Sequence, residues 1–138
     1  MNSPWKAGCS SLILSFMGKT DEAIERAQRA QRLSPFDSIN YLSNNALAIS
    51  YFLTGRHQDA HEAARRSVQL NPRFSVCHLF LTLALAGVGR IEEAREEAQR
   101  ALALDPAFSI SRFAVTVGFE PKVFTRLADA WRAAGLPD

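Results

Sequence analysis

Apolar and polar positions recur along the chain with helical spacing, and this pattern predicts three pairs of helices. In three segments, alanine and leucine return every three or four residues while charged residues occupy the remaining faces. Such spacing gives a helix one apolar stripe. A more continuously apolar segment precedes each of the three. The first helices are predicted at about 4–17, 39–53 and 75–87, and the second helices at about 21–33, 58–70 and 92–104.

An internal repeat runs through these pairs and is anchored on Gly18, Gly55 and Gly89. Each glycine is followed by alanine after five and nine residues, arginine after eleven, leucine after fifteen and proline after seventeen. Successive glycines lie 37 and 34 residues apart, which indicates a three-residue insertion near residues 37–40. Glycine permits a sharp turn between two helices, alanine lets helices approach closely, and proline ends each unit.

The spacing and the residue types resemble the tetratricopeptide repeat. The resemblance implies an all-α fold, an α-α superhelix or solenoid of three helix-turn-helix repeats at about 4–37, 41–74 and 75–108. The whole chain, 1–138, then forms a single domain. The tryptophan that the family often has eleven places before the glycine is replaced by Ala7, Asn44 and His78, whereas Tyr51 matches a common tyrosine.

The repeat pattern changes after Pro106, because Val123 stands where a fourth glycine would fall. Residues 107–117 still predict a helix, and Pro121 is well placed to begin a last helix at about 121–134. Its apolar stripe comprises Phe124, Leu127, Ala128 and Trp131. We therefore predict capping helices at about 107–135, with one face on the last repeat and the other in water.

A second resemblance lies in the segments 104–113 and 127–138. They are similar to the C-terminal tetratricopeptide region of bacterial signalling proteins that begin with a nucleotidyl cyclase or a winged-helix domain. Nothing in this chain matches the cyclase or the DNA-binding part. The resemblance implies the docking or regulatory end of such a bacterial protein, or a free-standing relative of it.

The tetratricopeptide resemblance implies that the first helices line a concave, protein-binding side. By register, the inward residues are Trp5, Gly8, Leu12, Phe16, Leu42, Asn45, Ile49, Phe52, Val76, Leu79 and Leu83. This set lacks the basic residues with which chaperone-binding members clamp a carboxylate, so we expect an apolar or helical segment as ligand. The alternative is that the protein's own C-terminal helix, or packing between helices, fills this stripe.

The leading helix also carries apolar residues around most of its circumference: Trp5, Leu12, Ile13, Leu14 and Phe16. Terminal repeats normally need a polar outer face. Either an upstream part of a longer protein covers this helix, or two copies pack together. We therefore hypothesise a homodimer through the N-terminal repeat, and a purely structural self-assembly segment is the alternative function.

Charge and composition narrow the class of partner. The chain has 16 Lys and Arg against 14 Asp and Glu, a net charge of +2, and the two signs are interspersed. This balance argues against nucleic acid as a partner. Its apolar runs are too short to span a membrane. Cys9 and Cys77 lie in apolar stretches and are read as buried thiols, so a cytoplasmic location is expected.

No residue constellation predicts catalysis. The sequence contains no GxGxxG, phosphate-binding loop or GxSxG motif. His57 and His61 have the spacing of a metal-binding pair, but no third ligand is evident nearby except Asp59 or Glu62. His78 is interpreted as a packing residue. We predict no catalytic residue, metal or cofactor, and a non-enzymatic protein-protein interaction module.

Glutamate and arginine recur one turn apart on the second helices, as Glu25 with Arg29, Glu62 with Arg66 and Glu96 with Arg100. Pairs of this kind contribute a few tenths of a kcal/mol each. They predict a solvated convex face.

Overall fold

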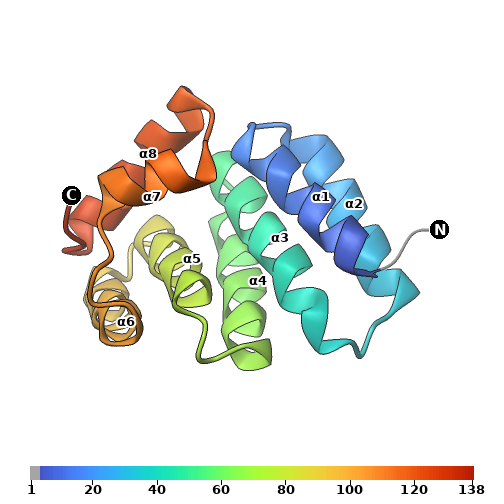
Figure 1. Ribbon diagram of the computed structural model, residues 1–138, viewed down its shortest axis with the longest axis horizontal. Helices are drawn as coiled ribbons and strands as arrows, with labels where there is room; N and C mark the ends of the chain where they lie inside the picture. Colours follow the sequence, from blue (N-terminus) through green and yellow to red (C-terminus); the bar gives the residue numbers. More distant parts are fainter. Residues whose placement is uncertain (1–3) are drawn as a thin grey trace.

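The computed structural model describes residues 4–138, and all regular secondary structure in that range is helical. The elements are α1 (Pro4–Phe16), α2 (Thr20–Leu33), the 3-10 helix η1 (Ser38–Asn40), α3 (Tyr41–Leu53), α4 (His57–Leu70), α5 (Ser75–Gly87), α6 (Ile91–Leu104), α7 (Ile110–Val117) and α8 (Pro121–Ala133). The all-α fold predicted from the sequence is confirmed (Figure 1). Within residues 4–138, no helix has the length and apolar character needed to cross a bilayer.

The helix pairs α1–α2, α3–α4 and α5–α6 are hairpins that turn at the repeated glycines. Gly18, Gly55 and Gly89 have φ values of 76°, 80° and 82°, a left-handed conformation that glycine adopts without a steric penalty. The amide after each glycine donates to a carbonyl five residues earlier, as Arg56 N does to Tyr51 O at 2.8 Å. These bonds close the C-terminus of each first helix and fix the reversal of the chain.

Alanine lines the contact between the two helices of each hairpin. The repeated alanines are completely buried: Ala23, Ala27, Ala60, Ala64, Ala94 and Ala98. Their small side chains allow the helices to approach closely, so a larger residue at these positions has no space without displacing the partner helix.

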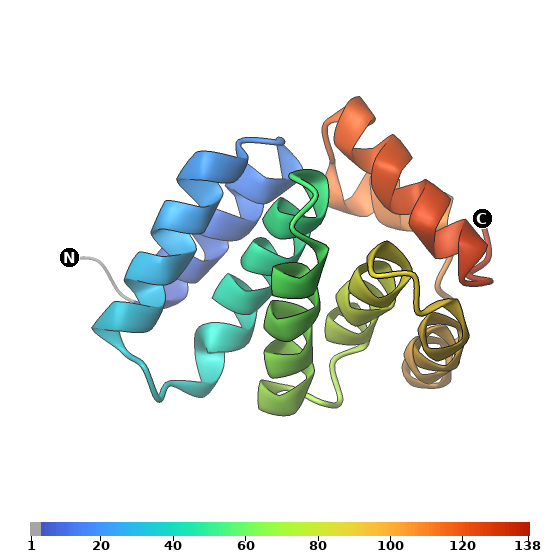
Figure 2. The same ribbon diagram turned by 180° about the vertical axis from the view of Figure 1, so that it is seen from behind.

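The hairpins stack in sequence order. Helix α3 packs on both α1 and α2, and α5 packs on both α3 and α4. First helices therefore lie beside first helices, and second helices follow on the other side of the stack (Figures 1 and 2). The insertion near residues 37–40 forms η1, whose preceding Asp37 accepts a hydrogen bond from Ile39 N at 3.0 Å.

The C-terminal hairpin α7–α8 departs from this stacking. Helix α8, not α7, packs on α5. Trp131 of α8 is completely buried and donates its indole N–H to Leu79 O at 2.8 Å. Its ring also stacks on Phe80 with centroids 6.4 Å apart. The last helix is thus joined to the first helix of the third repeat, and Figure 1 shows it at an angle to the stack.

Removing the Trp131 ring should destabilise the protein strongly. We expect Trp131→Ala to lower the free energy of unfolding by about 3 to 5 kcal/mol, because it leaves a large cavity and an unpaired Leu79 carbonyl. Urea denaturation measures this change. Trp5→Ala is the matched control, since Trp5 is 52% exposed, and it should cost less than about 1 kcal/mol. Equal losses in the two variants would show that α8 is not anchored as described.

Candidate protein-binding surfaces

The concave side predicted to bind a ligand is largely closed. Seven of the predicted residues are buried: Gly8, Leu42, Asn45, Ile49, Phe52, Leu79 and Leu83. Three are half-buried, namely Leu12, Phe16 and Val76, and Trp5 is exposed. The structure therefore corrects the expectation of an open groove at the seven buried positions. The side chains at these positions pack between neighbouring helices, and the C-terminal helix packs on α5.

Contacts from α8 and the turn before it reach all three first helices, at the C-terminal ends of α1 and α3 and along α5. Glu120 N donates to Phe16 O at the end of α1 at 3.0 Å. Arg126 donates to Leu53 O at the end of α3 at 2.6 Å. Trp131 reaches Leu79 on α5, as described above. Of the alternatives left open by the sequence, the structure therefore favours packing between helices, with the C-terminal helix covering part of α5.

Asn45, the polar residue of the predicted groove, is used inside the protein. The Ser67 hydroxyl of α4 donates to Asn45 Oδ1, and Asn45 Nδ2 lies 3.7 Å from Cys77 Sγ of α5. This buried polar cluster joins the second repeat to the third. An internally satisfied amide of this kind is not available to a ligand.

A buried ion pair that the sequence analysis missed joins α5 to α6. His78 Nδ1 bonds Glu97 Oε1, and His78 Nε2 lies 2.7 Å from Pro72 O. The second carboxylate oxygen of Glu97 accepts from Arg100 at 2.7 Å. His78 therefore forms hydrogen bonds that join α5 to α6, and it is not only a packing residue.

The surroundings of this pair shift both pKa values. The hydrogen bond to Glu97 raises the pKa of His78 above its ordinary value, against the opposing effect of burial. Burial by itself would raise the pKa of Glu97, but hydrogen bonds from His78 and Arg100 outweigh it and hold this pKa below its ordinary value. Both shifts favour the charged form of the group.

One signal in the sequence pointed to this pair. Glu97 lies on the apolar stripe of its helix, between Ala94, Ala98 and Ala101, where a solvated charge is not expected. A charge on a buried stripe needs a partner from a neighbouring helix.

The predicted surface pair of Arg100 with Glu96 is wrong, because Arg100 pairs with Glu97 instead. The predicted pair of Arg66 with Glu62 does form, with a distance of 3.9 Å.

The remaining histidines and the cysteines show no reactive arrangement. His57 packs on Phe52 with ring centroids 5.4 Å apart. The His57 ring also lies against Gly87, so close that a Cβ added at Gly87 would be 2.6 Å from His57 Nδ1. Burial, followed by nearby arginines, lowers the pKa of His61. Cys77 is buried as predicted, while Cys9 is only half-buried. Between residues 4 and 138, no three His, Cys, Asp or Glu side chains are grouped to hold a metal ion.

The first hairpin presents an uncovered surface on the side facing away from α3. We call it the end face, and it comprises Lys6, Ser10 and Ile13 of α1 with Glu22, Glu25, Arg26 and Arg29 of α2. Ile13 is 56% exposed, and all four α2 residues are exposed. On the opposite side of α2, Gln31 donates to Asn44 of α3 at 3.0 Å, which places the charged stripe away from the stack.

Equivalent positions in the other repeats are buried. Ile13 corresponds to Ser50 and Ala84, which are both 0% exposed. The equivalents of Lys6, Ser10 and Arg26 are also buried, namely Ser43, Leu47 and Ala63 in the second repeat and Cys77, Leu81 and Glu97 in the third. In those repeats a preceding hairpin packs on this side. The end face is therefore a stacking surface on which no described part of the chain packs.

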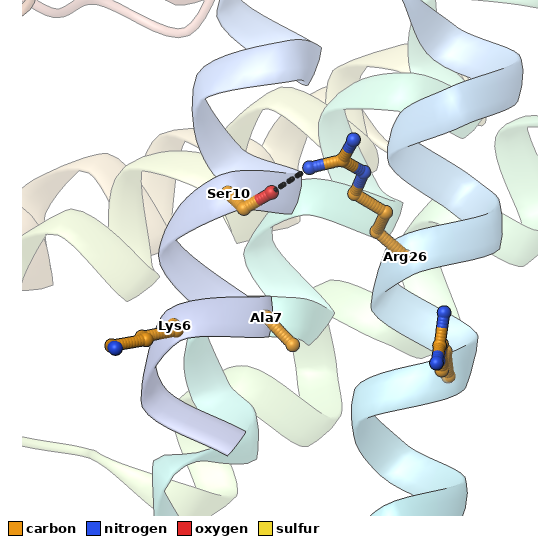
Figure 3. Close-up of a pocket in the computed structure, with 5 residues that line it drawn as sticks. Lys6, Ala7, Ser10 and Arg26 are labelled. Carbon is orange, nitrogen blue, oxygen red and sulfur yellow. Dashed lines mark hydrogen bonds between the residues drawn. The ribbon is translucent and has the colours of Figure 1, made fainter. Parts of the chain in front are cut away.

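A basic pocket opens on the end face between α1 and α2. It has a volume of about 400 Å³ and is lined by Lys6, Ala7, Ser10, Arg26 and Arg29. Arg26 reaches from α2 and donates to the Ser10 hydroxyl of α1 at 2.5 Å, while Lys6 points away from Arg26 (Figure 3). The arrangement suits a carboxylate or another anion at the mouth of the pocket.

Comparison with known proteins identifies the fold. No family model matches the sequence, and no curated protein matches it. A mutant of the O-GlcNAc transferase of Thermobaculum terrenum is similar in structure, with a TM-score of 0.67 and 20% sequence identity. The similarity covers 95% of this chain and 27% of that chain. This chain therefore has a tetratricopeptide-like helical repeat fold and spans about a quarter of the length of that transferase.

The ion pair between His78 and Glu97 should make the free energy of unfolding fall at low pH and also at high pH. Because the pKa of Glu97 is lowered on folding, its charge stabilises the folded state above about pH 4.5, and this stability is lost as the pH falls. Because the pKa of His78 is raised on folding, its charge stabilises the folded state below about pH 6.5, and this stability is lost as the pH rises. We expect Glu97→Gln to cost about 3 kcal/mol between these values and less on either side. Urea unfolding at about pH 3, 5.5 and 9 measures the difference.

Glu93→Gln is the control for this pair, because Glu93 forms an exposed ion pair with Arg90 at 2.8 Å. It should cost less than about 1 kcal/mol at every pH. A loss for Glu97→Gln that is small, or that does not change with pH, would contradict the assignment.

Proposed function

We propose that this chain is a non-catalytic protein-protein interaction module that binds through its end face and not through the concave side. The observation that carries the proposal is the exposure of Ile13 at a position that is fully buried in each of the other two repeats. A helical repeat cannot bury both of its sides alone and relies on a neighbour to cover each one. Exposure of a position whose counterparts are buried by a neighbouring hairpin marks this side as a surface that a partner can cover.

The ligand that fits this surface is a helical segment with apolar residues. Helix α3 occupies the corresponding side of the first hairpin toward the second repeat, where it packs on α1 and α2 together. A partner helix on the end face would pack in a similar way, with an apolar residue against Ile13. A helix usually binds such a surface through apolar side chains that recur every three or four residues along one of its faces.

We extend the proposal to the setting of the module, the docking end of a cytoplasmic bacterial signalling protein. The support is the resemblance of segments 104–113 and 127–138 to the C-terminal repeats of such regulators, together with the free thiols of Cys9 and Cys77.

Self-assembly is the second candidate function. It is favoured by the charge pattern on α2, where two glutamates and two arginines share the end face. A homodimer through the N-terminal repeat would cover Ile13 without a separate ligand.

Site-specific photo-crosslinking tests the binding surface. A photoreactive residue in place of Ile13 should give a covalent adduct with one defined helical segment of the bound partner, because a bound helix lies against this position. The same residue in place of Gln99, exposed on α6, should give none. A synthetic copy of the captured peptide should then bind the wild-type chain at least about tenfold more tightly than Ile13→Glu and no more tightly than Gln99→Glu. Adducts from Gln99 alone, or equal peptide binding by all three chains, would refute the proposal.

A further inference from the structure

The four charges on α2 are arranged symmetrically along the helix. The order is Glu22, Glu25, Arg26 and Arg29, within about two turns of one exposed face. Reversing the helix about the midpoint between residues 25 and 26 exchanges each glutamate for an arginine. A surface with this property is complementary to a copy of itself related by a two-fold axis.

These charges are not neutralised by ion pairs within residues 4–138. Among the described residues, none of the four side chains forms an ion pair, although glutamate and arginine four places apart are close enough to do so. Arg26 bonds the uncharged Ser10 hydroxyl instead. The second helices of the other repeats differ, since Arg66 pairs with Glu62 and Arg100 pairs with Glu97.

The symmetric pattern is confined to the repeat whose end face is uncovered. At the corresponding positions, α4 has Asp59, Glu62, Ala63 and Arg66, and α6 has Glu93, Glu96, Glu97 and Arg100. Neither set is complementary to its own reverse. The difference arises at one position, where Arg26 is exposed while Ala63 and Glu97 are buried.

We propose that the occupant of the end face is a second copy of this chain, with the two α2 helices antiparallel about a two-fold axis. Glu22 then faces Arg29 of the partner subunit, and Glu25 faces Arg26 of the partner subunit. The two carboxylates reach the basic pocket lined by Arg26 and Arg29. This inference rests on the end face as the binding surface and names the partner.

The same axis brings the two α1 helices together. Because Arg26 contacts Ser10, an axis through the middle of α2 crosses α1 close to Ser10. Helix α1 then lies antiparallel to its copy, with Lys6 beside Ile13 of the partner subunit. The methylene stem of a lysine covers apolar surface while its ammonium group stays in water. Burial of Ile13 adds an apolar contribution that charge alone would lack.

Charge exchange between the two members of a pair tests this geometry. Sedimentation equilibrium should show a dimer of the wild-type chain at about 100 µM, weakened severalfold between about 0.05 and 0.5 M salt. Glu22→Arg alone and Arg29→Glu alone each place like charges opposite one another, so each should weaken dimerisation by about tenfold or more. An equimolar mixture of the two variants should dimerise again, because each contact then joins opposite charges. The double variant Glu22→Arg with Arg29→Glu should also recover.

Glu62→Arg is the matched control, since Glu62 occupies the equivalent position to Glu25 on α4 and is likewise exposed in an ion pair. It should leave the dimer unchanged, and circular dichroism checks that every variant is folded. A monomeric wild-type chain at about 100 µM, or single variants that do not recover on mixing, would overturn the symmetric dimer. If the wild type is monomeric while Ile13 still captures another protein, the end face remains a binding surface and only the second copy is refuted.

Discussion

The structure depends on close contact between the two helices of each hairpin, which alanine makes possible. Because Ala23, Ala60 and Ala94 leave no side chain beyond Cβ at the contact, each pair of helices forms a thin, flat unit with two broad sides. Such a unit buries little apolar surface by itself. Its stability comes from the neighbour on either side, so the stack, and not the single hairpin, is the folding unit. Both the filled concave side and the uncovered end face follow from this requirement.

Much of the fold could be predicted from the sequence because its signals are local. The glycines at 18, 55 and 89 marked the hairpin turns, and Pro121 marked the start of the last helix, as the structure confirms. The direction in which α8 packs could not be read in the same way. A stripe containing Leu127 and Trp131 predicts that a helix buries one face, but not which neighbour it buries it against. That choice depends on contacts between residues more than fifty positions apart, such as Trp131 with Leu79.

The candidate surfaces were harder to predict for a related reason. Register alone places Leu42, Ile49 and Leu79 on the inner side of the superhelix, yet it does not show that neighbouring helices cover them. Glu97 and Arg26 carry a signal that the sequence analysis did not use, because they occupy the same position of two repeats, one buried beside a partner and the other exposed. Charged residues at a position that another repeat fills with a buried alanine, Ala63, are the places to look for specific contacts.

The C-terminal hairpin has a consequence for how the domain comes apart. Open helical repeats fray from their ends, since a terminal unit has only one neighbour to lose. Here the turn before α8 is hydrogen-bonded to α1 through Glu120 and Phe16, and the same helix is anchored on α5 through Trp131. The last helix and the turn before it thus connect the first repeat to the third. Unfolding of either terminal repeat would also break the contacts of α8, so we expect the stack to unfold cooperatively and not one repeat at a time.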